Sequence, residues 1–541
     1  MIETALADLQ RRDIVGRIWN RDHTVWKTDP TEISDRLGWL NVTGFMREQA
    51  SSLQAFAQQV RNDGIRHVVL LGMGGSSLGP EVIRQTFGST SGFPRLLVLD
   101  STIPDAVQAM TAEINPSTTL FLVSSKSGTT TESLSFYRHF RGLVEQFVGK
   151  ENAGPHFIAI TDPETPLEVL AQESGFRQVF TNPPDIGGRY SVLSYFGLVP
   201  AALVGMDITR LLDRADSMRT ECAPFVKDLQ NTDNPGARLG GTLGILALHG
   251  RNKLTLVTSP SIESFGLWAE QLIAESTGKE ERGIIPVSGE PLVHPANYGD
   301  DRQFVYLRLN GDENACTDAA IAAIESSGQP VLRLELQTMY DLGAEFFRWE
   351  FATVVAGAIL SIHPFDQPNV QQAKYETAVG LQEHRKSGRL PQVDAPGSIE
   401  SLLSKAQPGD YLAIMAYIHQ TPETDIALAD LRRRVTENHG IATTLGYGPR
   451  FLHSTGQLHK GGPDTGLFLQ LTTDRREDMP IPGESYTFGI LAKAQALGDL
   501  KVLLALERRV VRVQLPLGSN SEIMRLADEV GAARMITSAL S

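Results

Sequence analysis

The stretch IRHVVLLGMGGSSLGPEV, residues 65–82, joins an apolar run to a glycine-rich turn and then to the start of a helix-like segment. An apolar run without polar alternation is typical of a strand covered on both faces. Four further runs follow, separated by helix-like stretches: PRLLVLD (94–100), TLFLVSS (119–125), HFIAITD (156–162) and RQVFTN (177–182). This alternation predicts a doubly wound α/β unit with a parallel sheet.

The same pattern returns twice further along the chain. Strands are expected at KLTLVTS (253–259), RQFVYLRL (302–309) and PVLRLEL (330–336), followed by a buried helix at FFRWEFATVVAGAIL (346–360). A segment rich in Pro, Gly and polar residues, RKSGRLPQVDAPGS (385–398), predicts a linker. Three more runs indicate a smaller α/β unit: DYLAIMAYI (410–418), TGLFLQLT (465–472) and RVVRVQL (509–515).

The length of 541 residues exceeds what one hydrophobic core usually serves, so several domains are expected. We predict an N-terminal helical segment (1–60) that could wrap onto something larger, a first α/β domain (61–215), a second (235–385), a linker (386–405) and a C-terminal α/β extension (406–541).

Composition excludes several classes of protein. With 49 basic and 63 acidic residues the net charge is -14, which argues against non-specific nucleic-acid binding. No apolar run reaches the roughly 18–20 residues that span a bilayer, and residues 1–19 have no signal-peptide pattern. Cys222 and Cys316 are too few for a disulfide framework or a zinc site. We expect a cytoplasmic protein without a membrane partner.

The second loop of the first unit, SSKSGTTTES (124–133), is the most informative. It follows a predicted strand, leads into a helix that starts near Thr130, and places several hydroxyl groups around one glycine. Hydroxyl groups and free N–H groups at a helix N-terminus suit a phosphate dianion. Lys126 could raise the local potential or simply be solvated. A serine-rich turn without a ligand is the alternative.

The first loop, at Gly72–Ser77, also lies between a strand and a helix. Its glycines permit positive φ and the close approach of a ligand. The spacing differs from the dinucleotide fingerprint, which makes a nicotinamide enzyme a weak interpretation. A tight turn with an N-cap serine remains the alternative.

Three further segments carry candidate catalytic groups. IGGRYSVLSYFGLVP (186–200) can deliver Arg189 into a cleft as a permanently charged donor, or pair it structurally. In SIESFGLWAEQLIAESTGKEERGIIPV (261–287), Gln271 and Glu275 lie four residues apart and share one helix face. A glutamate there could serve as a general base, although a solvated surface residue is the ordinary alternative. In HPFDQPNVQQAK (363–374), Gln367 and Lys374 lie about two helical turns apart.

Taken together, these five segments resemble the glucose-6-phosphate isomerase family, which consists of two sugar-isomerase (SIS) domains of three αβα layers. The motifs G-G-R-Y-S, S-K-x-x-T-T and F-D-Q-P occur in the right order, over residues 65–380. The resemblance implies an isomerase of glycolysis and gluconeogenesis that binds a hexose 6-phosphate, needs no cofactor and no metal, and forms a homodimer.

The resemblance also implies roles for individual residues. Glu275 would move the proton between C1 and C2, Arg189 would stabilise the enediolate oxygen, and Lys374 would assist ring opening. Gln271 and Gln367 would hold sugar hydroxyls. The phosphate would be bound by Gly75, Ser76, Ser125, Lys126, Ser127 and Thr130.

The sequence departs from the family in two places. The ring-opening histidine of the motif G-x-x-G-Q-H is missing from the region after Glu275, where residues 297–307 read NYGDDRQFVYL. The chain instead continues into GPRFLHSTGQLHKGGPDTG (448–466), which partly echoes that motif. We expect His459, or else His453 or His363, to enter the active site, and a glycine-rich surface loop is the alternative. The extension resembles that of isomerases fused to a transaldolase.

Two other functions remain open at this point. One is a bifunctional phosphoglucose and phosphomannose isomerase, because one enediol serves both C2 epimers. The other is a non-catalytic sugar-phosphate-binding regulator, against which the combination of Glu275 and Arg189 argues.

Overall fold

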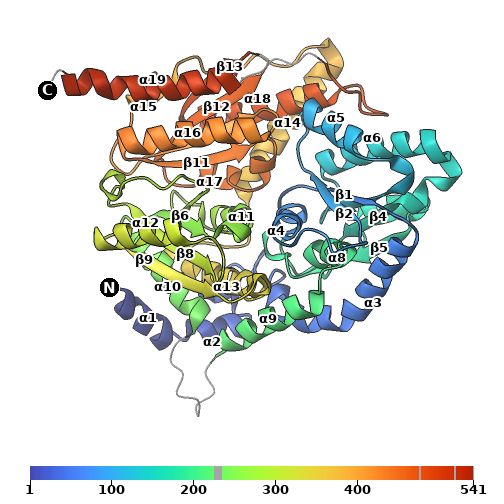
Figure 1. The fold of residues 1–541 in the computed structure, drawn as a ribbon, viewed down its shortest axis with the longest axis horizontal. Coiled ribbons are helices and arrows are strands. Elements are labelled where there is room, and N and C mark those ends of the chain that lie inside the picture. The colour runs from blue at the N-terminus through green and yellow to red at the C-terminus, as the bar shows by residue number, and fades with distance from the viewer. Residues whose placement is uncertain (225–233, 474–476, 517–519, 540–541) are drawn as a thin grey trace.

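The computed structural model describes the whole chain except residues 225–233, 474–476, 517–519 and 540–541, and it omits the side chains of residues 532–539. Three parallel sheets organise the molecule (Figure 1). The first has the strand order β2-β1-β3-β4-β5. Its strands are β1 (His67–Leu71), β2 (Arg95–Leu99), β3 (Thr119–Ser124), β4 (Phe157–Thr161) and β5 (Gln178–Thr181). All five predicted runs form these strands.

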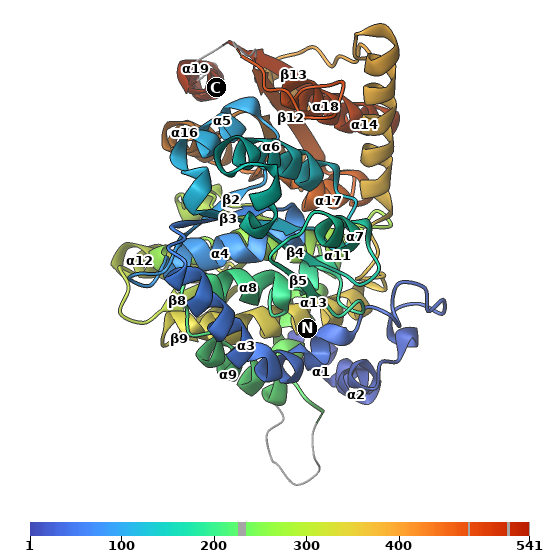
Figure 2. The same ribbon diagram turned by 90° about the vertical axis from the view of Figure 1, so that its right-hand side faces the viewer.

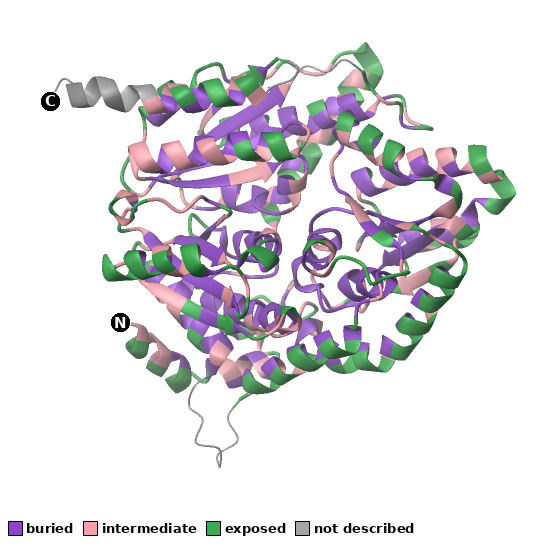
Figure 3. Cartoon of the chain, in the orientation of Figure 1, coloured by how far each residue is buried: buried purple, intermediate pink, exposed green. Residues whose placement is uncertain are grey.

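Both faces of the first sheet are covered, as the apolar runs require. Val68 and Leu70 of β1 pack into one hydrophobic cluster, whereas Val69 and Leu71 pack into another. Successive side chains of a strand point to opposite faces, so the two clusters are the two covering layers. Every residue of β3 and of β4 is buried, and Figure 3 shows the strands as mostly buried elements behind exposed helix faces.

The second sheet has the order β7-β6-β8-β9. Its strands are β6 (Lys253–Thr258), β7 (Ile285–Ser288), β8 (Arg302–Leu309) and β9 (Val331–Leu336). The sequence analysis missed β7, which has only four residues and contains Pro286. A proline cannot donate to a sheet ladder and is tolerated at an edge, which is where β7 lies.

The third sheet has the order β11-β10-β12-β13. Its strands are β10 (Tyr411–Tyr417), β11 (Ala442–Tyr447), β12 (Gly466–Thr473) and β13 (Arg509–Leu515). The sequence analysis missed β11 because ATTLGY mixes threonines and a glycine rather than forming an apolar run. Each sheet lies within one predicted α/β unit, and the predicted fold class, α/β with three parallel sheets, is confirmed. The limits of the domains stay a prediction.

The helix expected at 346–360 is the longer α13 (Leu342–Leu360), which is buried on nearly all sides. It packs against α9 (Ile208–Glu221), α10 (Pro235–Leu248) and α11 (Phe265–Thr277). Since α9 follows the first sheet and α11 belongs to the second, α13 lies at the junction of the two units.

The N-terminal segment is helical and lies against this junction. It contains α1 (Ile2–Arg11), α2 (Ile14–Trp19) and α3 (Val42–Asn62). The indole N–H of Trp26 donates to the carbonyl of Val354 in α13 at 2.8 Å. The segment therefore wraps onto the core of the second unit.

The third sheet is joined to the rest by α14 (Pro368–Ser387), which packs against α18 (Phe488–Ala505) of the C-terminal extension (Figure 2). Residues 388–398, most of the predicted linker, form neither helix nor strand. In the part of the chain that is described, no helix has the length and apolar character needed to cross a membrane.

Candidate active site

The glycine-rich turn after β1 packs tightly against the loop that carries Arg189. Gly74 has a φ of +56°, and a Cβ on Gly75 would lie 2.0 Å from the carbonyl oxygen of Gly188. A side chain at Gly75 would therefore force the two loops apart. Ser76 is buried in this turn, and its carbonyl oxygen accepts a hydrogen bond from Ser124 Oγ at 3.3 Å.

The hydroxyl-rich turn after β3 lines a cavity of about 310 Å³. It ends at Thr130, the N-cap of α6 (Thr131–Val148). Two hydrogen bonds close the turn on itself, from Ser125 Oγ to Thr130 Oγ1 at 2.9 Å and between Ser127 Oγ and Thr129 Oγ1 at 3.0 Å. Hydroxyl groups and the first N–H groups of α6 thus surround a cavity large enough for a small ligand.

The two lysines among the predicted site residues, Lys126 for the phosphate and Lys374 for ring opening, have different positions relative to this cavity. Lys126 Nζ is ion-paired with Asp162 and donates to the carbonyl of Pro184 at 3.2 Å, and Lys126 does not line the cavity. Lys374, on α14, is exposed and does line it. The positive charge available at the cavity is therefore that of Lys374, and the geometry does not support a direct phosphate contact for Lys126.

Arg189 lies at the centre of a second, buried cluster. Its side chain is 4% exposed, and it donates hydrogen bonds to residues that lie far apart in the sequence. Its contacts are Ser276 Oγ (2.8 Å), Pro364 O (2.8 Å), Asp366 O (3.0 Å) and Gln367 Oε1 (2.9 Å), with Glu275 Oε1 at 3.3 Å from Nη1. These contacts join the end of α11 to the loop before α14 and hold the guanidinium beside the carboxylate of Glu275.

Gln271 connects this cluster to the cavity. Its Nε2 donates both to Glu275 Oε2 at 3.0 Å and to the carbonyl of His453 at 2.8 Å. The expected shared helix face of Gln271 and Glu275 is thus present as a direct hydrogen bond. His453 lines the cavity together with Thr130 and Lys374. His453 therefore lies between the hydroxyl-rich turn and the Gln271–Glu275 pair.

His453 reaches the cavity from the C-terminal extension of the same chain. Its Nε2 is hydrogen-bonded to Glu132 Oε1 at 2.9 Å, and Gln495 Nε2 donates to the same oxygen at 2.6 Å. Burial alone would raise the pKa of Glu132, but the charge and hydrogen bond of His453, with Lys374 nearby, hold it below its ordinary value. A buried, ionised carboxylate bonded to one ring nitrogen fixes the orientation of the imidazole.

His459, the histidine expected first, lies elsewhere. Its ring packs between Phe451 and Phe468, with centroid distances of 5.7 and 5.2 Å, and it is 3% exposed. Burial, with the charges of Lys460 and Arg508, lowers its pKa well below the ordinary value, and it does not line the cavity. The expected stretch does supply a histidine to the site, but at position 453.

His363, the remaining candidate, has a structural position. Its Nδ1 accepts hydrogen bonds from the backbone N–H groups of Phe365 and Asp366, at 3.1 and 3.3 Å, and its Nε2 lies 3.0 Å from the carbonyl of Thr31. It therefore fixes the loop that contacts Arg189.

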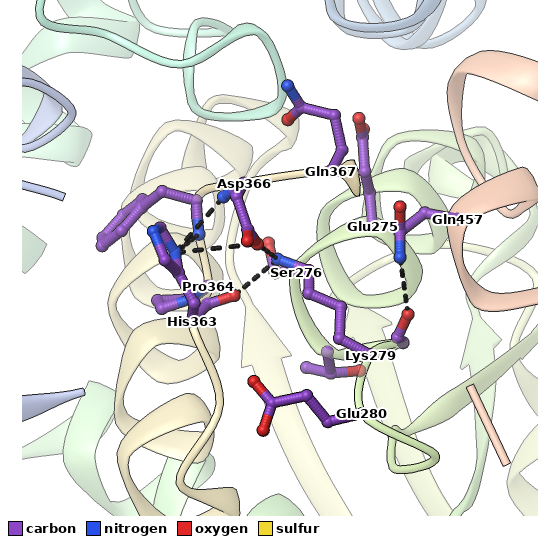
Figure 4. A network of polar contacts seen from close by, with 12 residues as sticks. Glu275, Ser276, Lys279, Glu280, His363, Pro364, Asp366, Gln367 and Gln457 are labelled. Atoms are coloured by element: carbon purple, nitrogen blue, oxygen red, sulfur yellow. Dashed lines mark hydrogen bonds and ion pairs between the residues drawn. The ribbon is translucent and has the colours of Figure 1, made fainter. Parts of the chain in front are cut away.

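The sequence analysis missed Lys279, which stabilises the same loop (Figure 4). Its side chain is 3% exposed, and Nζ contacts Asp366 Oδ1 at 2.6 Å and the carbonyl of His363. Burial and the nearby Arg189 lower the pKa of Lys279 to about 7, although Asp366 raises it. Its position directly after Gly278, which ends α11, was the available signal. Glu132 was missed because an acid in the first turn of a helix usually needs no further explanation.

The fold and the predicted site can be compared with those of sugar-phosphate isomerases, whose members also contain parallel α/β domains. The model of the phosphoglucose isomerase family matches residues 32–280. The chain is 28% identical over 409 residues to glucose-6-phosphate isomerase of Staphylococcus saprophyticus, covering 68% of this chain and 90% of the relative. It is also 28% identical over 390 residues to that of Rubrobacter xylanophilus, covering 64% and 89%.

Solved structures agree on the fold. A glucose-6-phosphate isomerase from Chlamydia trachomatis superposes with a TM-score of 0.60 at 19% identity, over 71% of this chain and 86% of that one. A hypothetical protein from Thermus thermophilus gives a TM-score of 0.58 at 24% identity, over 72% and 97%. This chain is thus similar to the phosphoglucose isomerase family over residues 32–280, and the predicted resemblance is confirmed.

Proposed function

We propose that this protein interconverts glucose 6-phosphate and fructose 6-phosphate, with Glu275 as the base that moves a proton between C1 and C2. The observation that carries the proposal is the continuous contact from Glu275 through Gln271 to His453, which lines the cavity of the hydroxyl-rich turn. Glu275 itself does not line the cavity, so the hexose would have to reach it past Gln271. The names of the relatives support the same reaction.

The first task of the site is to anchor the phosphate. Ser127, Thr130 and the N–H groups at the start of α6 would bind it, with Lys374 supplying charge. Ser125, which donates to Thr130, and Ser76, in the turn on the neighbouring strand, do not line the cavity and would support the turn. Binding energy from the phosphate end positions the reacting carbons without entering the chemistry.

Ring opening comes next. His453, oriented by Glu132, would act as the general acid that gives a proton to the ring oxygen as the bond between C1 and that oxygen breaks. The C1 hydroxyl gives its proton to solvent water in the same step, so the open chain carries a carbonyl at C1. Lys374 lines the same cavity as His453 and would assist.

Isomerisation then needs one base and one fixed cation. Glu275 would remove the proton from C2, and Arg189 would stabilise the negative oxygen of the enediolate, a contribution that a buried and preoriented guanidinium makes well. Once the hydroxyl proton of O2 has moved to O1, return of the proton from Glu275 to C1 gives the ketose. Gln271 and Gln367, each hydrogen-bonded to a member of the Arg189–Glu275 pair, would hold sugar hydroxyls.

The test is a coupled assay of fructose 6-phosphate conversion. Glu275→Gln keeps the shape of the side chain but removes the base, and we expect turnover to fall by about 10²–10⁴-fold. Glu263→Gln, at an exposed position just before the same helix, is the control and should retain activity. Inactivity of the wild type towards every hexose phosphate, combined with binding of the phosphate, would favour a regulator instead.

Product analysis separates the remaining alternative. Mannose 6-phosphate among the products would indicate the bifunctional isomerase. The homodimer, the cytoplasmic location and the link to a transaldolase fusion stay predictions that these experiments do not address.

A further inference from the structure

The short 3₁₀ helix that ends at His453 begins at a residue anchored to the first sheet. This helix, η11, spans Arg450–His453. Arg450 Nε and Nη2 each donate a hydrogen bond to Asp100, to Oδ2 and Oδ1, both at 2.8 Å. Asp100 directly follows β2 and is 2% exposed. A two-bond arginine–carboxylate fork fixes orientation as well as distance.

Asp100 also contacts the glycine-rich turn. Ser77 Oγ donates to Asp100 Oδ2 at 3.2 Å and to the carbonyl of Gly74 at 3.2 Å. A Cβ on Gly74 would lie 2.8 Å from the carbonyl oxygen of His453, so this turn and the end of η11 are in close contact. One carboxylate therefore ties the turn after β1 to the segment that carries the histidine.

The contact between His453 and Glu132 joins two different units, so it needs an anchor that holds these units in register. Glu132 lies on α6 of the first unit, whereas His453 follows β11 of the third sheet. The contact between Nε2 and Oε1 is 2.9 Å, and a displacement of about 1 Å can cost a catalytic contact roughly 10²-fold in rate. Among the described contacts, those of Arg450 with Asp100 attach the beginning of η11 to the first unit.

We propose that the Asp100–Arg450 pair is a positioning device for His453, and that through it the C-terminal extension acts as a working part of the active site. The proposal rests on the proposed isomerase function. Arg450 itself does not line the cavity of the hydroxyl-rich turn, so it acts on the reaction through His453 and not by touching the substrate.

The experiment compares two substrates. Fructose 6-phosphate must be opened before it reacts, whereas an acyclic analogue that lacks the ring-forming hydroxyl bypasses His453. For Arg450→Gln we expect turnover of the ring-closed substrate to fall roughly 10²-fold, with the acyclic analogue changed by less than about threefold. Exchange of the C1 or C2 proton with solvent deuterium, followed by NMR, measures both substrates in the same units.

A matched control comes from inside the extension. Arg509 makes the same two-bond contact with Asp410, at 2.6 and 2.9 Å, but at the opposite end of the third sheet. Arg509→Gln should lower stability without changing the ratio of the two rates. Arg450→Lys keeps the charge but not the fork, and it should give an intermediate ratio at a melting temperature close to that of the wild type.

The outcomes distinguish this inference from the function on which it rests. An equal loss on both substrates, or the same selective loss in Arg509→Gln, would overturn the positioning role. If Arg450→Gln does not fold, the ratio in Arg450→Lys decides, and an unchanged ratio there overturns the inference. A wild type that turns over neither substrate refutes the isomerase proposal itself.

Discussion

Two loops bring polar groups to the same cavity, and they differ in whether their stabilising contacts lie within one unit or between units. The turn from Ser125 to Thr130 follows β3 of the first sheet, and the segment that contains His453 follows β11 of the third. Both begin at the carboxyl end of a parallel strand, where α/β proteins usually bind ligands. The first is closed by hydrogen bonds between its own hydroxyls and is otherwise held by its own unit, through the contact of Lys126 with Asp162. The second is held by Asp100, Glu132 and Gln271, which belong to other units.

The comparison shows that contacts within one unit position the first loop, whereas contacts between units position the second. A turn stabilised by its own residues and by the next strand of its own sheet can be recognised from a short stretch of sequence. A segment stabilised by distant partners depends on every contact between the units. We therefore expect substitutions in the first loop to weaken phosphate binding, and those around the second to act on ring opening.

The largest effect should come from His453→Gln, which removes the imidazole that the second loop supplies to the cavity. Loss of a positioned acid is expected to lower turnover of ring-closed fructose 6-phosphate by about 10²–10⁴-fold. The acyclic analogue should retain most of its rate, because its ring need not be opened. Steady-state kinetics on the two substrates check this. Equal losses on both substrates would contradict a specific role of the second loop in ring opening.

A smaller effect is expected from Thr130→Val in the first loop. A hydrogen bond to a charged group contributes about 1.5–3 kcal/mol, so kcat/KM should fall roughly 10–100-fold on both substrates. Lys126→Met sharpens the comparison, since its ammonium pairs with Asp162 away from the cavity. Competition by inorganic phosphate measures binding in both variants. A stronger effect from Lys126→Met than from Thr130→Val would contradict the geometry.

The smallest effect on activity should come from His459→Leu, six residues beyond His453. His459 is buried with its pKa well below the ordinary 6.5. Below about pH 6.5 the unfolded chain binds a proton there that the folded chain does not, so the wild type loses stability as the pH falls.

In His459→Leu the free energy of unfolding should therefore fall less as the pH is lowered, and the difference from the wild type should reach up to roughly 2 kcal/mol at about pH 5. Denaturant titrations at several pH values measure it, with His249→Leu as an exposed control. A large loss of turnover in His459→Leu would restore His459 as the catalytic candidate.

The strands of the first sheet could be predicted almost residue by residue, because buried parallel strands must be apolar throughout. The two missed strands, β7 and β11, are both at sheet edges, where a proline or polar residues are tolerated. In the site, Glu275 and Gln271 were accessible because helical spacing places them on one face. Lys126 was assigned to the phosphate only by its position in the motif, and its side chain turns to Asp162.

By itself, the sequence determined the parallel α/β architecture, the hydroxyl-rich turn and the Gln271–Glu275 pair, since each depends on hydrophobic pattern, glycine placement or helical spacing within about thirty residues. Tertiary structure alone decided which histidine meets Glu132, and that Lys374 and not Lys126 faces the cavity. Those outcomes depend on contacts between residues hundreds of positions apart, whose geometry is set by how three sheets pack and not by any local preference.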